Sequence, residues 1–285
     1  MSTPATSPTA SNPLWNRFGS YAVAVALAAF IALPLAWMVI SSIKPADQLF
    51  SSPPRILADH WTINWYVTVF RDSGAAVFFW NSLVVGLSST IFCLVIGTLA
   101  AYAITRFDFP GKSAFLIAAL VTYMFPAIVL FVPIYMILNT LSLIDTRIGL
   151  VICHTILTFP FAVWMLKSFF ETLPREIDEA AWVDGCSYLG TFIRIVLPLS
   201  LPGIFSVAIF VFVLSWNEFL FASIVMTSSD LKTVPVGISE FITSFDIRWG
   251  EIMALGTLAT VPVVVLFSLV QRYFLRGVLS GAVKG

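Results

Sequence analysis

A single glutamate stands well inside an apolar run in the last third of the chain. Glu218 follows Trp216 and Asn217 directly. A charge at the middle of a membrane costs about 2.5–3.5 kcal/mol on insertion scales, so such a residue usually faces a cavity or a partner. An aromatic ring beside an amide and a carboxylate suits a polyhydroxylated ligand, because the ring covers C–H faces while the polar groups bond hydroxyls. We therefore predict that Trp216, Asn217 and Glu218 line a solute pathway, the alternatives being a subunit contact and interfacial anchoring by the indole.

The other reactive residue types do not form a catalytic or metal-binding set. His154, alone near the start of another apolar run, is expected to hydrogen-bond a neighbouring helix, the alternative being a proton relay. Two histidines cannot build a histidine-rich metal site, and the three cysteines suggest no disulfide framework. No G-x-S-x-G or H-E-x-x-H motif occurs, and no pair of carboxylates stands within the apolar runs. The sequence predicts a protein that is not an enzyme.

One short stretch resembles the end of a nucleotide-binding loop. Gly111-Lys112-Ser113 has the last letters of that motif, but Arg106 stands where its first glycine should be. No strand is expected before it, although the phosphate-binding loop requires one. We expect no cofactor on this chain, and any ATP and Mg²⁺ to be bound by another polypeptide.

The composition is that of an integral membrane protein. Apolar residues make up 59% of the 285 residues, charged residues 11%, and the mean hydropathy is +0.96, against about 45–50% apolar and about 25% charged in soluble domains. The net charge is zero, which gives no electrostatic reason to expect nucleic acid. The partner implied by such a surface is membrane lipid.

Six apolar runs are long enough to cross a bilayer, which takes about 20 residues. They predict an all-α, polytopic fold with six transmembrane helices at Ser20–Ser41, Ser82–Ile104, Ser113–Leu138, Ile148–Phe169, Leu199–Met226 and Ile252–Tyr273. Nine of the 15 Lys and Arg residues fall on one side, which places both termini in the cytoplasm. The expected organisation is a disordered N-terminal tail at 1–19, a six-span domain at 20–275 and a C-terminal tail at 276–285.

A connection of nearly thirty residues separates the fourth and fifth spans on the cytoplasmic side. Thr172 is a possible N-cap of a first helix, and Gly185 can take the positive φ of a C-terminal stop. Ser187 can cap a second short helix that ends before Pro198. The first helix is acidic and has a face of small residues, so docking against a protein is favoured over resting on anionic headgroups.

This connection also contains a set of residues at a recognisable spacing. Glu179-Ala180-Ala181, Gly185, Ile195 and Leu197-Pro198 stand at the spacing of the EAA signature, and the chain resembles the permease subunits of ABC importers. The resemblance implies a coupling helix between the fourth and fifth spans. These seven residues would then dock on an ATPase subunit.

The resemblance extends from about residue 80 to the C-terminus, where the chain resembles the second permease subunit of maltose-type carbohydrate importers. Further segments carry it: Asn81-Ser82, Ala100 to Ala103, Arg106 to Lys112, Trp216 to Phe219 and Ser280 to Gly285. It implies a sugar or sugar-like solute, a second homologous permease subunit, two ATPase subunits and an external, periplasmic solute-binding protein. Within that family a C-terminal tail contact would involve Gly281, Lys284 and Gly285.

The segment between the fifth and sixth spans holds aromatic residues among polar ones. By resemblance it would probe the docked binding protein, and packing over the bundle mouth is the alternative. The candidates are Val236, Gly237, Phe241, Phe245 and Trp249. The rival for the whole chain is a secondary transporter, but no convincing internal repeat supports it.

Overall fold

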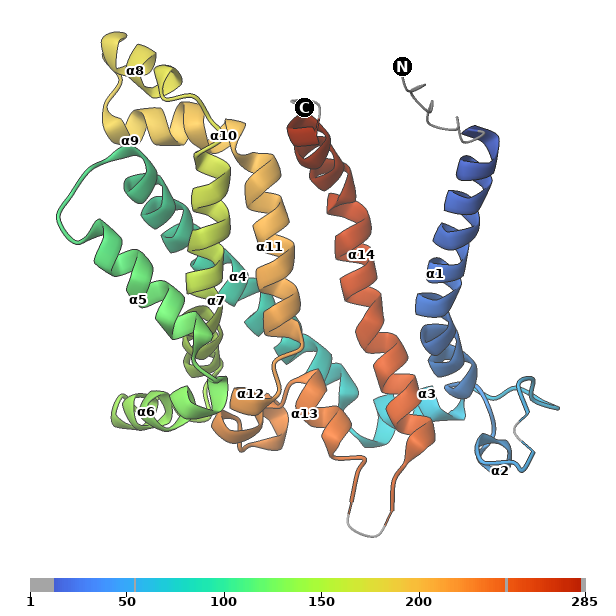
Figure 1. Cartoon of the computed structure of the whole chain (residues 1–285). Coiled ribbons are helices and arrows are strands. Elements are labelled where there is room, and N and C mark those ends of the chain that lie inside the picture. Colours follow the sequence, from blue (N-terminus) through green and yellow to red (C-terminus); the bar gives the residue numbers. More distant parts are fainter. Residues whose placement is uncertain (1–12, 54, 244–245, 283–285) are drawn as a thin grey trace, which may run out of the picture.

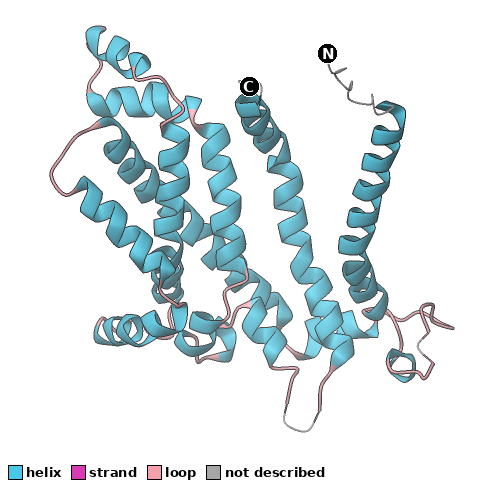
Figure 2. Ribbon diagram, in the orientation of Figure 1, coloured by secondary structure: helices cyan, strands magenta, loops and turns pink. Residues whose placement is uncertain are grey.

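The computed structural model describes residues 13–53, 55–243 and 246–282, and in these ranges the chain is built of helices (Figures 1 and 2). No strand occurs in them, apart from an isolated bridge between Ile242 and Ile247. The predicted all-α class is confirmed. The helices are α1 (Pro13–Ser41), α2 (Ala46–Leu49), α3 (Asn64–Asp72), α4 (Ala75–Arg106), α5 (Lys112–Met124), α6 (Ala127–Thr140), α7 (Arg147–Phe170), α8 (Glu176–Val183), α9 (Tyr188–Thr191), α10 (Leu197–Leu199), α11 (Leu201–Trp216), α12 (Leu220–Val225), α13 (Val234–Ser239) and α14 (Trp249–Ala282).

Four helices in the described ranges are long and apolar enough to cross a membrane: α1, α4, α7 and α14. Two bent pairs bring the number to the predicted six if each pair is one span. The axes of α5 and α6 differ by 107°, and the run Tyr188–Leu199 meets α11 at 77°. The first bend falls inside the predicted third span, and the second falls at the start of the predicted fifth span.

The break in the third span follows from one proline. Proline disfavours the helical conformation of the residue before it and has no N–H to donate. Phe125, which precedes Pro126, is extended with φ −67° and ψ 135°, and α5 ends there. Pro34, Pro160 and Pro262 instead lie inside continuous helices.

Helix α4 is central and packs against α7 and α11, while α14 packs against α11, α3 and α1. Small residues permit the close approach of α4: a side chain added at Gly97 would touch Leu166 of α7, and one at Gly86 would press on Phe212 of α11. Buried apolar side chains form three separate clusters. They are centred on Leu138, Leu150 and Phe221, on Tyr102, Phe170 and Phe192, and on Phe78, Phe212 and Leu255.

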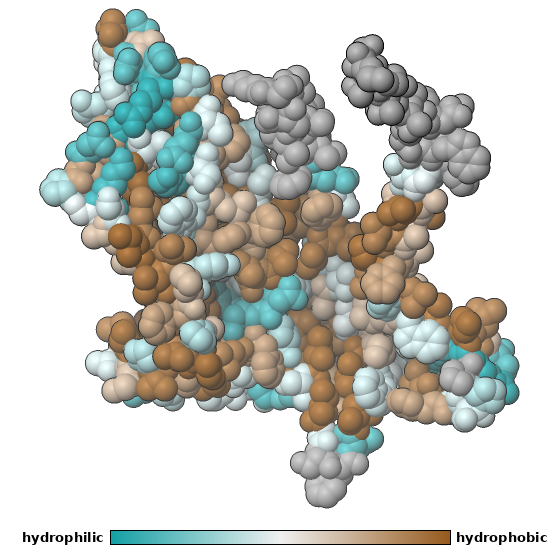
Figure 3. All heavy atoms as spheres, viewed as in Figure 1, coloured by the Kyte–Doolittle hydropathy of each residue, from teal (hydrophilic) through white to brown (hydrophobic). Residues whose placement is uncertain are grey.

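The bundle has two distinct ends, which we call the α8 end and the α13 end. Figure 1 shows α8 and α9 at the top, on the same side as the start of α1 and the end of α14. The helices α6, α12 and α13 lie at the opposite end. In Figure 3 polar residues gather over the α8 end, and apolar residues dominate the middle of the same face.

The helical termini reach into the segments expected as tails. Helix α1 begins at Pro13, inside the predicted tail 1–19, and α14 continues through Ala282, inside the predicted tail 276–285. Gly281 thus belongs to α14. Lys284 and Gly285 lie outside the described residues.

Candidate functional site

Glu218 sits at a break between two helices. Helix α11 ends at Trp216 and α12 begins at Leu220. The carboxylate of Glu218 accepts the backbone N–H of Phe221 at 2.8 Å and that of Ala222 at 2.9 Å. N–H groups at a helix start have no intrahelical partner, so the carboxylate satisfies two of them. Glu218 is therefore the cap that lets the fifth span break.

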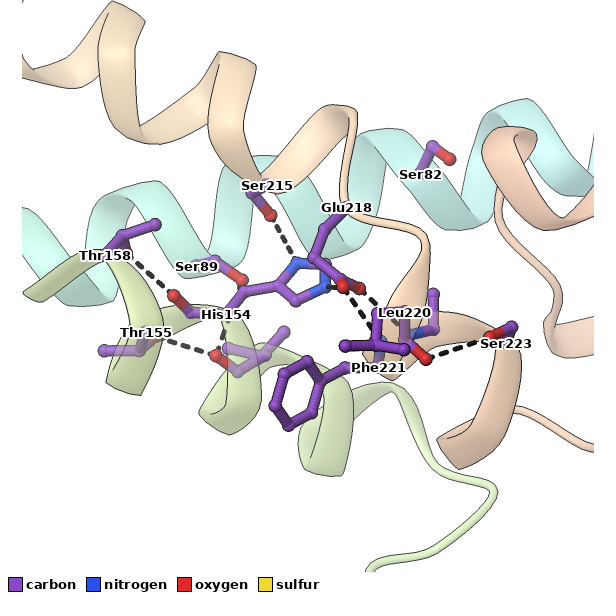
Figure 4. Close-up of polar contacts among 12 residues, drawn as sticks. Ser82, Ser89, His154, Thr155, Thr158, Ser215, Glu218, Leu220, Phe221 and Ser223 are labelled. Carbon is purple, nitrogen blue, oxygen red and sulfur yellow. Dashed lines mark hydrogen bonds and ion pairs between the residues drawn. The ribbon is translucent and has the colours of Figure 1, made fainter. Parts of the chain in front are cut away.

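The same carboxylate faces a buried histidine of α7 (Figure 4). The Nε2 atom of His154 lies 3.1 Å from Oε2 of Glu218, and its Nδ1 atom lies 2.5 Å from the hydroxyl oxygen of Ser215. His154 is only 1% exposed. Its predicted hydrogen bonding to a neighbouring helix is confirmed, and the partners join α7 to the end of α11.

A pocket of about 460 Å³ opens beside this cluster. His154, Ser215 and Glu218 line one part of it, and Tyr123 and Phe125 at the break between α5 and α6 line another. The break between α5 and α6 and the break between α11 and α12 therefore border the same hollow. Tyr123 is 52% exposed, and no periodicity in the sequence places it at the same pocket as Glu218.

The two residues before Glu218 point elsewhere. Trp216 is buried, stacks on Phe212 and donates its indole N–H to the carbonyl of Ala259 at 3.1 Å. Asn217 is exposed, and its amide bonds the carbonyl of Val213 in its own helix at 2.8 Å. Of the predicted trio, the structure brings only Glu218 to the pocket.

At the α13 end, Asn81 fastens the segment before α13. Its amide nitrogen donates to the carbonyls of Asp230 and Lys232, at 2.9 and 3.0 Å, and its oxygen accepts from Nε of Arg147 at 2.9 Å. The neighbouring hydroxyl of Ser82 accepts the N–H of Val234 at 2.8 Å. The sequence marked Asn81-Ser82 only as part of a resemblance, and the contacts show their physical use.

Most of the residues expected to contact a binding protein are packed inside. Val236 and Phe241 are 5% and 3% exposed. Gly237 is buried, and a side chain there would collide with the ring of Phe78. Trp249 is partly exposed beside Phe50, and Phe245 lies outside the described residues.

Asp145 joins two further segments at the α13 end. Its carboxylate accepts the N–H groups of Thr227 and Ser228, each at 2.9 Å, and the hydroxyl of Ser228. The hydroxyl and backbone bonds from Ser228 lower the pKa of Asp145 below its usual range, because they favour the charged form. The loop before α7 is thereby joined to the segment after α12.

At the α8 end, helix α8 stops as the sequence predicts. Gly185 has φ +85°, its N–H bonds the carbonyl of Trp182, and the N–H of Cys186 bonds that of Ala181. This pair of bonds is the Schellman stop, for which glycine is the usual residue. The predicted cap by Ser187 is also confirmed, since its hydroxyl accepts the N–H of Gly190 at 3.1 Å.

Two local expectations in this connection are wrong. Thr172 does not cap α8, because its hydroxyl donates to the carbonyl of Phe169 in the last turn of α7. The second helical segment does not end before Pro198. It runs through α9, a π-helical turn at Phe192–Val196 and α10, since proline near the start of a helix leaves no needed N–H missing.

The seven residues of the EAA signature differ in their exposure to solvent. Glu179, Ala180 and Gly185 are exposed, as is Pro198, whereas Ala181 is buried and Ile195 and Leu197 are partly buried. The small-residue face of α8 was expected to contact another protein, but only part of it is exposed.

Sequence reasoning missed Asp178, the residue just before this signature. Its side chain is 1% exposed and pairs with Arg106 of α4, with 2.9 Å between Oδ2 and Nε. In the sequence Asp178 does not differ from the other acidic residues of this helix, and its partner lies far away along the chain.

No group of three or more His, Cys, Asp and Glu side chains in the described ranges could hold a metal ion. The chemistry available is hydrogen bonding and charge pairing at the pocket, at the α13 end and on α8.

Comparison with known proteins identifies the family. Residues 93–280 match the model of the binding-protein-dependent transport system inner membrane component. The chain is 36% identical over 272 residues to the inner membrane ABC transporter permease protein YcjP of Escherichia coli (strain K12), covering 95% of this chain and 97% of the relative. It is 34% identical over 265 residues to the trehalose/maltose transport system permease protein MalG of Thermococcus litoralis, covering 92% and 95%.

The fold agrees with these matches. A bacterial ABC transporter involved in import of the acidic polysaccharide alginate has a chain that superposes with a TM-score of 0.79 at 18% identity, over 95% of this chain and all of that one. The family match overturns the secondary-transporter alternative. The chain belongs to the family of binding-protein-dependent transport system inner membrane components, and it is a multi-pass permease subunit of an ABC importer.

Proposed function

We propose that this permease subunit imports a sugar or sugar-like solute, and that the pocket beside Glu218 and His154 is its part of the solute pathway. The pocket carries the proposal, because it joins a carboxylate, an imidazole and an exposed tyrosine ring. Such groups bond hydroxyls and cover C–H faces. The name of the trehalose/maltose relative supports the same class of solute.

The pocket is an open hollow on one chain, bordered by the break between α5 and α6 and by the break between α11 and α12. Irregular backbone at membrane depth is tolerated where it is buried in protein or lines a water-filled cavity. A second homologous permease subunit would close the pocket from the other side. This arrangement assigns Glu218 to the pathway and Trp216 to packing, while Asn217 bonds its own helix outside the pocket.

The exposed face of α8 is proposed as the surface that docks on a cytoplasmic ATPase subunit. Glu179, Ala180 and Gly185 lie on it, with Val183 at 88% exposure. An apolar residue so exposed beside small neighbours fits a protein contact. Two ATPase subunits would bind ATP and Mg²⁺, and this chain would have no enzymatic activity of its own.

Docking of α8 in the cytoplasm sets the orientation. The start of α1 and the end of α14 lie at the same end as α8 (Figure 1), so both termini would be cytoplasmic. The end of α14 with Gly281 would then continue toward the ATPase subunits. Opposite, the α13 end would meet the periplasmic binding protein through the exposed Ile242, Ile247 and Trp249 rather than through the buried Val236, Gly237 and Phe241.

Affinity purification of this chain from its native membrane, followed by mass spectrometry, tests the assembly. We expect a stoichiometric P-loop ATPase and a second six-span subunit. Vesicles that contain the complex and its binding protein would then be offered maltose, trehalose, diacetylchitobiose and, as a control, amino acids. Uptake of amino acids without any sugar would refute the proposed solute class, and recovery of the chain alone would refute the proposed assembly.

A further inference from the structure

A buried ion pair joins the coupling region to the central helix. Arg106 is the last residue of α4, and Asp178 lies in the first half of α8. Their side chains are 3% and 1% exposed, with 2.9 Å between Nε and Oδ2. Removing two charges from water is costly, so such a pair is weak evidence for stability, and its best-attested use is to fix one arrangement of the parts it joins.

Further bonds join the same two regions. The hydroxyl of Tyr102 donates to Oδ1 of Asp178 at 2.8 Å. Arg106 also donates to the carbonyl of Leu173 at 3.1 Å, and Arg175 donates to the carbonyl of Thr105 at 2.9 Å. The last turn of α4 is therefore bonded to α8 and to the residues leading into it.

Aromatic rings surround this link. The ring of Tyr102 lies 4.9 Å from that of Phe192, and Phe107, just after α4, meets Tyr188 of α9 at 5.3 Å. Tyr188 in turn contacts Trp182 of α8 at 4.9 Å. The connection between α7 and α11 is thus packed on α4 through α8 and α9, while the opposite face of α8 stays exposed.

Helix α4 is also fastened at its other end. Asn81 and Ser82 bond the segment from Asp230 to Val234, as described above. Between Asn81 and Arg106 the helix is continuous, and at 1.5 Å per residue that distance is about 37 Å. Of the four long spans, α4 alone has no proline inside it.

We propose that Arg106 and Tyr102 are positioning residues for Asp178, and that they make α8 and α4 move as one rigid body. A displacement of α8 by the ATPase would then reach the binding-protein side directly through α4. This inference rests on the proposed docking of α8, and it adds the route by which the docking signal crosses the membrane.

The test compares two isosteric changes in the purified complex of both permeases and the ATPase, reconstituted with the binding protein. Asp178→Asn removes the buried charge on α8, and Glu171→Gln removes a charge from an exposed residue directly after α7. Uptake of maltose, trehalose or diacetylchitobiose, whichever the unmodified complex accumulates, is measured together with ATP hydrolysis. We expect Asp178→Asn to raise the ATP hydrolysed per solute imported by about threefold to thirtyfold and Glu171→Gln to leave it unchanged.

A distance measurement tests rigidity without any solute. Spin labels at Asp108→Cys, just beyond α4, and Glu176→Cys, in a Cys186→Ser background, report the separation of α4 and α8. We expect one narrow distribution of distances between the two labels, with the same mean without nucleotide and with MgATP and vanadate. Adding Asp178→Asn should broaden it or make it differ between the two states.

Tyr102→Phe keeps the ring and removes only the hydroxyl. This variant replaces Asp178→Asn in both measurements if the Asp178→Asn complex fails to assemble. We expect it to change the transport ratio and the label distances in the same direction, by a smaller amount. Recovery of the transport ratio in the exchange Arg106→Asp with Asp178→Arg would further support the pair. Unchanged distances and an unchanged ratio in an assembled Asp178→Asn or Tyr102→Phe complex would overturn the inference. Loss of the ATPase from the unmodified complex would instead refute the proposed function.

Discussion

The imidazole of His154 and the carboxylate of Glu218 meet between α7 and the break after α11, with 3.1 Å between Nε2 and Oε2. Each partner is held by a second set of bonds. His154 contacts Ser215, and Glu218 caps α12. The contact therefore determines both the shape of the pocket and the place where the fifth span stops being helical.

Glu218→Gln should reduce uptake strongly while the subunit stays assembled. The amide keeps one acceptor oxygen but loses the charge, and hydrogen bonds to charged groups contribute about 1.5–3 kcal/mol. We expect a fall in uptake rate of about tenfold or more at every solute concentration, measured in the reconstituted vesicles. Asn217→Ala is the matched control, since that amide bonds only its own helix. Equal uptake in the Glu218→Gln and unmodified complexes would remove Glu218 from the pathway.

Ala180→Leu and Ala181→Leu should fail in different ways. Ala180 is exposed, so added bulk there leaves the subunit folded and reduces the amount of co-purified ATPase. Ala181 is 4% exposed, and overpacking a filled site costs about 1–3 kcal/mol, so this variant should lower thermal stability. Pull-down and melting of the same preparations separate the two. Normal ATPase recovery with Ala180→Leu would contradict the proposed docking face.

Part of this architecture could be predicted from sequence. Hydropathy placed six spans because the bilayer demands long apolar runs, and Gly185 predicted a helix stop because few other residues take its positive φ. The breaks were not predictable in the same way. Pro126 interrupts a span, whereas Pro34, Pro160 and Pro262 do not, because neighbouring helices decide which freed backbone groups find partners.

The candidate site was predictable only in part for a related reason. Glu218 stood out because a charge in an apolar run needs a partner. The sequence could not show that Trp216 turns inward toward Ala259, or that Asp178 pairs with Arg106. Those facts depend on how α4, α8, α11 and α14 pack, and local spacing carries no record of contacts between distant segments.

Asn81→Ala should loosen the segment before α13. The change removes two donors to the carbonyls of Asp230 and Lys232 and the acceptor for Arg147. A typical net contribution is about 1 kcal/mol per hydrogen bond, and two of the three lost bonds hold this segment, so its local opening should become easier by about 2 kcal/mol. Hydrogen exchange at the amide of Val234, which Ser82 holds, is the measurement, and we expect it to accelerate by about tenfold or more. Ser82→Ala provides a second variant at the same contact, and unchanged exchange in both would show that other packing holds the segment.

The Asp145 contact gives a prediction for pH. Its pKa is lowered in the folded protein by the bonds from Ser228 and Thr227, so the contact stabilises the fold above the ordinary Asp pKa of about 3.9. The contribution is lost as the pH falls through the lowered value. The melting temperature of Asp145→Ala should therefore lie below that of the unmodified chain by a constant amount from pH 7 to 5, and the gap should narrow below about pH 4. A gap that grows on acidification would contradict this assignment.

The division of the interior into three apolar clusters has a mechanical consequence. Several buried hydroxyls of α4 and α7 bond carbonyls of their own helix, one turn earlier, as Thr90, Thr155 and Thr158 do. These bonds do not resist sliding of one helix along another, and small sliding of packed helices is the shear type of domain closure. The apolar clusters that lie between α4 and α7 are held by non-directional contacts. Helix α4, with α8 attached to it, can thus slide a short way along α7 as one body, without the clusters being unpacked.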